Sequence, residues 1–182
     1  MEFKNSIHER LPIITNTAHC ARALAFAESK NIFFAIGKQD PWGSNENETD
    51  FIPPEPDVNA TNLDGLIGMK RAERVSLVIP DENGEFEYQK IKFKTLTNEE
   101  AFERKARWVL IETTIFYDEL PPLPYRQIGV FSRVKPVAGK ELSDVLLPED
   151  IEDVGILEVL NNRKAVTRQS DTKDTYFMVI EC

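Results

Sequence analysis

The sequence predicts a β-dominated α+β protein, in which an antiparallel sheet or sandwich carries one N-terminal helix and a long projecting acidic loop. One alanine-rich segment near the N-terminus has helical spacing. Roughly seven or eight later segments are rich in β-branched and aromatic residues, and prolines or an Asn-Gly turn signal separate them. The 182 residues are enough for a single structural domain, 1–182, with a substantial core.

The helix is expected over residues 15–30. Thr15, Asn16 or Thr17 can serve as its N-cap, because an oxygen on these side chains accepts a bond from a free backbone amide. Lys30 would lie near the C-terminal end, where a positive charge suits the helix dipole.

The first strand is expected at residues 32–36, a continuous apolar run that indicates burial on both faces. Gly37 follows it and is expected to serve a turn or a close backbone approach. Residues 74–80 predict the next strand, and the turn signal at 81–84 predicts a hairpin to 86–94. Alternation in that last segment puts Ile91 and Phe93 inside and three lysines in water.

Residues 98–105 predict one or two helical turns with Asn98 as the cap. Residues 108–117 are the most strand-like segment, so its large apolar side chains are expected to be buried; these are Trp108, Leu110, Ile115 and Phe116. The proline-rich residues 120–124 lie between two strands, which favours a rigid corner over a ligand for an SH3-type domain.

Residues 127–134 predict another strand, and 140–153 are acidic and mixed, with a short helix expected at 141–146. Short strands are expected to complete the fold, at 155–160, 165–168 and 175–181. A turn at Asn161-Asn162 would separate the first two.

The loop over residues 38–64 is the most informative segment. Seven acidic residues and no Lys or Arg lie between Lys38 and Lys70. A long loop inside a compact domain is usually functional or disordered, and this one also carries prolines and aromatic residues. We interpret it as a stiff acidic arm that binds a partner through Trp42, Phe51, Pro53, Pro54 and Pro56. The alternative is a surface loop whose Trp42 folds back onto its own core.

An acidic arm is expected to form ion pairs with arginines, because the planar guanidinium suits interface ion pairs. Arg71, Arg126 and Arg163 are therefore candidate interface residues, and the arm of one copy could dock against them on another subunit. The alternative is ordinary surface pairing, which contributes little. We expect the acidic arm not to pack on its own acidic body.

The formal net charge of −9 argues against nucleic-acid binding through the bulk surface, which depends on Lys and Arg. The two cysteines form no disulfide framework and no CxxC metal pair, so a reducing compartment fits best. No run is long enough to cross a bilayer, and the N-terminal segment, residues 1–14, lacks the apolar core of a signal peptide.

Candidates for catalysis are few. His8 lies in a charged segment, and His19 is next to Cys20, but neighbours on a helix point about 100° apart and do not face each other. The acidic loop lacks the spacing of an EF-hand, and common nucleotide, hydrolase and zinc-protease motifs are absent. No catalytic residue, metal or cofactor is therefore predicted, and the protein is not expected to be an enzyme.

Several motifs follow one another over most of the chain. They are Ile32–Gly37, Pro41-Trp42, residues 44–48 (SNENE), Phe51, residues 53–56 (PPEP), 65–71 (GLIGMKR), 75–80 (VSLVIP), 125–130 (YRQIGV), 155–157 (GIL), Asn162-Arg163 and residues 176–180. In this order they resemble a baseplate wedge protein of contractile-tailed, T-even-type bacteriophages, in a shortened form with less sequence between the motifs.

The resemblance implies a structural protein of the virion tail or baseplate, assembled in the host cytoplasm. It implies other tail or baseplate subunits as partners and a homo-oligomer, a dimer in that family. Membrane and nucleic acid are not expected as partners. A neck, tail-completion or connector protein remains an alternative, and a tail-associated hydrolase is a third.

Overall fold

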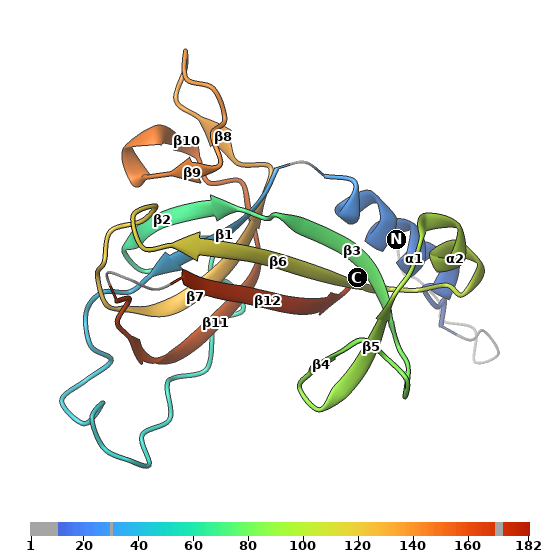
Figure 1. Ribbon diagram of the computed structural model, residues 1–182, viewed down its shortest axis with the longest axis horizontal. Helices are drawn as coiled ribbons and strands as arrows, with labels where there is room; N and C mark the ends of the chain where they lie inside the picture. The colour runs from blue at the N-terminus through green and yellow to red at the C-terminus, as the bar shows by residue number, and fades with distance from the viewer. Residues whose placement is uncertain (1–10, 30, 170–172) are drawn as a thin grey trace, which may run out of the picture.

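The computed structural model describes residues 11–29, 31–169 and 173–182. Two five-stranded antiparallel sheets pack face to face, and two helices lie together at one end of this sandwich (Figure 1). The predicted β-dominated class with an N-terminal helix is confirmed.

The first sheet has the order β11 (Ile156–Val166), β7 (Tyr125–Ser132), β1 (Ile32–Gly37), β2 (Leu66–Arg71) and β9 (Val145–Leu146). The second has the order β12 (Lys173–Glu181), β6 (Trp108–Phe116), β3 (Arg74–Pro80), β5 (Ile91–Thr95) and β4 (Phe86–Tyr88). The remaining elements are α1 (Asn16–Ala27), α2 (Asn98–Glu103), the paired strands β8 (Lys135–Pro136) and β10 (Ile151–Asp153), and the 3-10 helix η1 (Pro148–Asp150).

Strand β1 is central, and all six of its residues are buried, as its apolar sequence predicts. Phe34 points into the core between the sheets. Phe33 belongs to a second cluster on the other face of the first sheet, which Val134 and Leu146 help to cover. Because both faces are covered, a continuous apolar run is stable in this position.

Both helices begin at a hydroxyl cap. The Thr15 side chain accepts a bond from the Ala18 amide, so α1 starts where predicted, while Lys30 lies outside the described residues. The cap of α2 is Thr97 rather than Asn98. Thr97 and Glu100 each accept the other's backbone amide, and this reciprocal pair satisfies two amides at once.

The predicted hairpin between residues 74–80 and 86–94 is wrong. The turn at Asp81 forms, but the following segment is split by a two-residue turn at Gln89-Lys90, where φ is 49° and 68°. Strand β5, and not β4, returns beside β3. Phe93 is therefore buried, whereas Ile91 lies next to the turn and is 49% exposed.

Two further expectations are corrected. No turn interrupts β11 at Asn161-Asn162, because both residues pair with β7 and the Asn162 side chain accepts a bond from Gln127. Residues 141–146 are not helical. Leu146 instead pairs with Met69 of β2 and is buried, so tertiary packing overrides the local helical preference.

Burial along β6 was predicted only in part. Leu110 and Ile115 are buried, but Trp108 is half-buried and Phe116 is 45% exposed. Trp108 and Leu110 join a small cluster on the outer face of the second sheet, which the β4–β5 hairpin covers. Phe116, the last residue of β6, belongs to none of the buried clusters.

Candidate assembly interface

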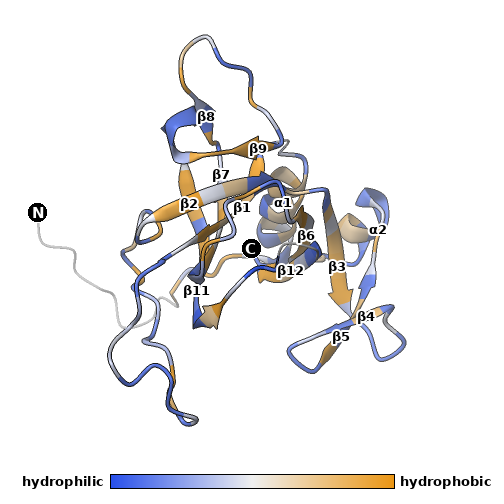
Figure 2. Cartoon of the chain, turned by 60° about the vertical axis from the view of Figure 1, so that its left-hand side comes forward, coloured by the Kyte–Doolittle hydropathy of each residue, from blue (hydrophilic) through white to orange (hydrophobic). Residues whose placement is uncertain are grey.

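The long acidic loop, residues 38–64, connects β1 to its neighbour β2 and projects from the sandwich (Figure 1). Most of it is hydrophilic (Figure 2). At its root the Lys38 amide donates to the Asp64 carbonyl oxygen, and the Lys38 ammonium lies 2.6 Å from the Asp64 carboxylate. The two ends of the arm are thus held together.

Leu63, near the C-terminal end of the arm, packs against the first sheet, and it is only 5% exposed. It packs against two glycines. A Cβ on Gly37 would lie 2.8 Å from the Leu63 Cβ, and one on Gly129 would lie 2.9 Å from its Cδ2. The close approach expected at Gly37 is confirmed, because only a residue without a side chain leaves room for Leu63.

The first half of the arm is held by a buried ion pair. The Arg126 Nε on β7 lies 2.7 and 2.8 Å from the two carboxylate oxygens of Glu46, and both side chains are less than a tenth exposed. Glu46 also accepts a bond from the Trp42 amide (3.0 Å), and Arg126 donates to the Gln39 carbonyl oxygen. One charge pair thus organises residues 39–46.

Burial alone would raise the pKa of the Glu46 carboxyl. The hydrogen bonds from Arg126 and the Trp42 amide, together with the Arg126 charge, lower this pKa below its usual value instead.

A lowered carboxyl pKa predicts a stability that depends on pH. The contribution of Glu46 is fully present above its unfolded pKa of about 4.3, and it is lost as pH falls through the lower pKa of the folded state. We expect the stability difference between wild type and Glu46→Gln to be constant at neutral pH and to shrink in acid. Urea unfolding at several pH values measures it, and a difference that grows in acid would contradict the assignment.

Trp42 also contacts its own chain. Its Nε1 donates to the Arg163 carbonyl oxygen (2.9 Å), the Lys38 ammonium lies 5.3 Å from its ring centre, and the residue is half-buried. The expectation that the acidic arm would not pack on its acidic body is therefore wrong. Arg126 and Lys164 on the facing strands provide local positive charge, which the net charge of the chain does not reveal.

The far end of the arm is more exposed. Phe51 and Pro53 are half-buried, and Pro54 and Pro56 are exposed. The strongest apolar exposure is at Ile52 (83%) and Val58 (96%), which the sequence interpretation missed. Their signal was available, because both are aliphatic residues set among prolines and acids in a long loop.

The three candidate arginines do not form one basic patch. Arg126 is buried against the arm of its own chain. Arg71 lies at the end of β2 away from the arm, where it bonds to Asp144 (2.8 Å) and the Leu142 carbonyl oxygen (2.6 Å). The Arg163 guanidinium carbon lies 5.8 Å from the centre of the Tyr125 ring. Their interface role stays a prediction.

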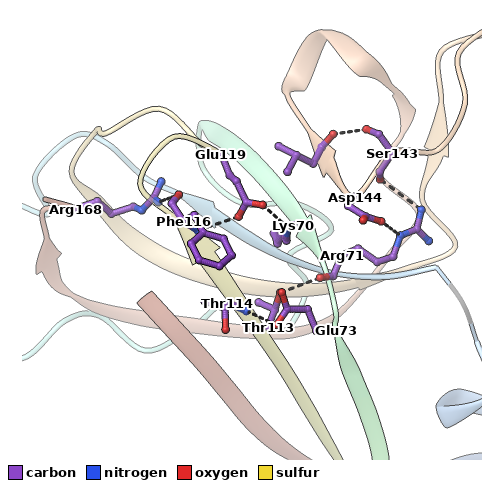
Figure 3. A network of polar contacts seen from close by, with 11 residues as sticks. Lys70, Arg71, Glu73, Thr113, Thr114, Phe116, Glu119, Ser143, Asp144 and Arg168 are labelled. Atoms are coloured by element: carbon purple, nitrogen blue, oxygen red, sulfur yellow. Dashed lines mark hydrogen bonds and ion pairs between the residues drawn. The ribbon is translucent and has the colours of Figure 1, made fainter. Parts of the chain in front are cut away.

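A second polar network surrounds Arg71 (Figure 3). Buried Lys70 forms an ion pair with Glu119, and Glu119 accepts a bond from the Phe116 amide (2.8 Å). Arg168 donates to the carbonyl oxygens of Phe116 and Leu120. These bonds hold the proline-rich connector after β6 against the sheets, as expected for a rigid corner.

No described side chains form a recognisable catalytic or metal group. Burial raises the pKa of the Cys20 thiol, which donates to the Ala101 carbonyl oxygen, and this disfavours a reactive thiolate. His19 Nδ1 donates to the Cys182 carbonyl oxygen (2.6 Å) and not to Cys20. His8 lies outside the described residues. Within the described chain there is no cluster of three or more potential metal ligands and no helix that could span a membrane.

A family model described as baseplate wedge 3 tail fiber network component matches residues 11–182. The chain belongs to this family. A relative, Virion protein 3 of Enterococcus phage phiEF24C, is 32% identical over 180 residues, which cover 94% of this chain and 96% of the relative. This baseplate wedge 3 component is therefore a structural, baseplate-related virion protein that interacts with other subunits of the phage tail. The resemblance to a baseplate wedge protein is confirmed.

Proposed function

We propose that this baseplate wedge component works only by protein–protein assembly and that its acidic arm binds a neighbouring tail subunit. The observation that supports the proposal is a difference in exposure between two parts of the arm. Its root and first half are held by Leu63 and the Glu46–Arg126 pair, while Ile52 and Val58 extend into water. An apolar surface on a pre-ordered support loses little entropy on binding.

The residues of the arm take different roles in this proposal. Trp42, Arg126 and the Arg163 carbonyl group hold the arm in place. The contact surface consists of Phe51, Ile52, Pro53, Pro54, Pro56 and Val58. Because the arm is acidic, its partner carries Lys and Arg around an apolar surface, and these charges set register and select the partner.

The remaining parts of the proposal concern chemistry and assembly. Family membership and the buried Cys20 support a protein without catalytic activity. The family description favours the baseplate over the neck or tail-completion alternative. We also propose that the protein self-associates, binds neither nucleic acid nor membrane, and joins the particle in the host cytoplasm.

Substitution of the exposed aliphatic residues tests the arm. Ile52→Ser combined with Val58→Ser should leave the melting temperature of the isolated protein nearly unchanged, because neither side chain is buried. The variant should enter baseplates poorly when it replaces the wild-type protein in infected cells. The measurement is the amount of this protein in purified particles, together with the yield of infectious phage.

Ile91→Ser is the matched control, since Ile91 is a half-exposed isoleucine on β5, outside the arm. It should enter particles normally. Equal incorporation of the arm variant and the control would contradict the proposal that the arm is a contact surface.

A further inference from the structure

Four strands form the outer edges of the two sheets, and three of these edges are protected. Strands β9 and β4 contain two and three residues, too few to pair with another strand over any length. Strand β11 is long, but its pairing with β7 shifts register twice, and the arm covers part of it through the bond from Trp42 to Arg163. Short edges, bulges and covering loops are the usual protections against edge-to-edge pairing.

Strand β12 lacks these protections. All nine of its residues pair with β6 in one unbroken register, and it contains no proline. No described strand pairs with its other side. A groove of about 580 Å³ runs beside residues 175–179, with β11 and the turn at Tyr88 as its walls. Phe177, in the middle of the strand, is 44% exposed.

We infer that β12 pairs antiparallel with β12 of a second copy around a two-fold axis, which joins the second sheets of two subunits. The inference rests on the self-association in the proposed function and specifies its surface. Such an interface is self-complementary. A residue that lies a given number of positions before the two-fold axis contacts the residue of the second copy that lies the same number of positions after it.

The sequence of β12 fits this arrangement. With Phe177 opposite Phe177 of the second copy, Lys173 lies opposite Glu181 at both ends, and Thr175 lies opposite Val179. Opposite charges and apolar pairs at facing positions stabilise antiparallel strands. A register shifted by two residues would place Lys173 opposite Val179, or Glu181 opposite Thr175, and lose both charge pairs, so the charges select one register.

The charged groups are available for this contact. Lys173 is exposed and forms no ion pair with any residue in the described part of the chain. Glu181 lies 2.8 Å from Arg107, yet its side chain is 54% exposed and can accept a second partner.

Charge reversal tests the pairing. The molar mass of the full chain is measured by sedimentation over a range of concentrations at low salt. Wild type is expected to form dimers. Lys173→Glu and Glu181→Lys should each weaken dimerisation by about ten-fold or more, because each change places like charges opposite one another at two symmetric positions. The double variant, and a mixture of the two single variants, should dimerise like wild type, since both restore opposite charges.

Arg22→Glu is the matched control, an exposed charge reversal on α1 that should leave dimerisation unchanged. Thermal melting verifies that each variant is folded. If wild type dimerises and Lys173→Glu dimerises equally well, the β12 pairing is overturned while self-association stands. If wild type stays monomeric at high concentration, both are overturned, and the arm proposal is unaffected because its test uses particles.

Discussion

Arg126→Ala should destabilise the protein by about 3–5 kcal/mol and release the acidic arm. The substitution leaves the Glu46 carboxylate buried without its cation, and an unpaired buried charge is far more costly than the pair is favourable. The free energy of unfolding in urea measures the loss. Limited proteolysis should show faster cleavage within residues 39–51 than in wild type.

Two further variants separate the ion pair from other effects. Arg22→Ala removes an exposed arginine and should change stability by less than about 0.5 kcal/mol. Arg126→Met combined with Glu46→Leu should recover most of the loss, because two apolar side chains of similar size often replace a buried pair at little cost. An Arg126→Ala protein as stable as Arg22→Ala would mean that the arm does not depend on this pair.

Phe34→Ala should cost about 3–5 kcal/mol, because it opens a cavity between the two sheets. The Phe34 side chain is 1% exposed, and its ring centre lies 6.4 Å from that of Tyr176 on the opposite sheet. The midpoint of urea unfolding should fall sharply, with little change in the slope of the transition.

Phe116→Ala is the comparison that makes this result informative. Phe116 is also a phenylalanine in a strand, but it is 45% exposed, so its loss should cost much less. Equal costs at the two positions would show that the sandwich core is not where the structure places it.

The local sequence was enough to predict those strands and helices whose burial or ends are set by their own residues. The apolar run of β1 indicates burial on both faces, and the Thr15 cap marks the start of α1. The β4–β5 turn could not be predicted in this way. Gln89 and Lys90 adopt left-handed conformations that these residue types seldom adopt, and the Phe86 and Phe93 rings stack across the hairpin that this turn closes.

The long acidic loop that carries the candidate interface was predicted, since its length and charge are visible in the sequence. Its attachment was not, because Glu46 meets Arg126 from a strand 80 residues away and nothing local links the two. Net charge was a poor guide here. A single well-placed arginine determines where the first half of an acidic segment packs, whatever the sum of charges over the chain.

The pairing of Lys38 with Asp64 at the base of the arm also has an evolutionary consequence. Since the arm leaves and re-enters the sheet at adjacent positions, each doubling of its length would cost only about 0.6 kcal/mol in closure entropy. We therefore expect the fold to tolerate insertions, deletions and new sequences in residues 47–61. Glu46, directly before this stretch, is fixed by its ion pair, because any replacement arm must supply a carboxylate for Arg126. Under the proposed role of the arm, a phage lineage can thus change the neighbour that the arm contacts without redesigning the domain that carries it.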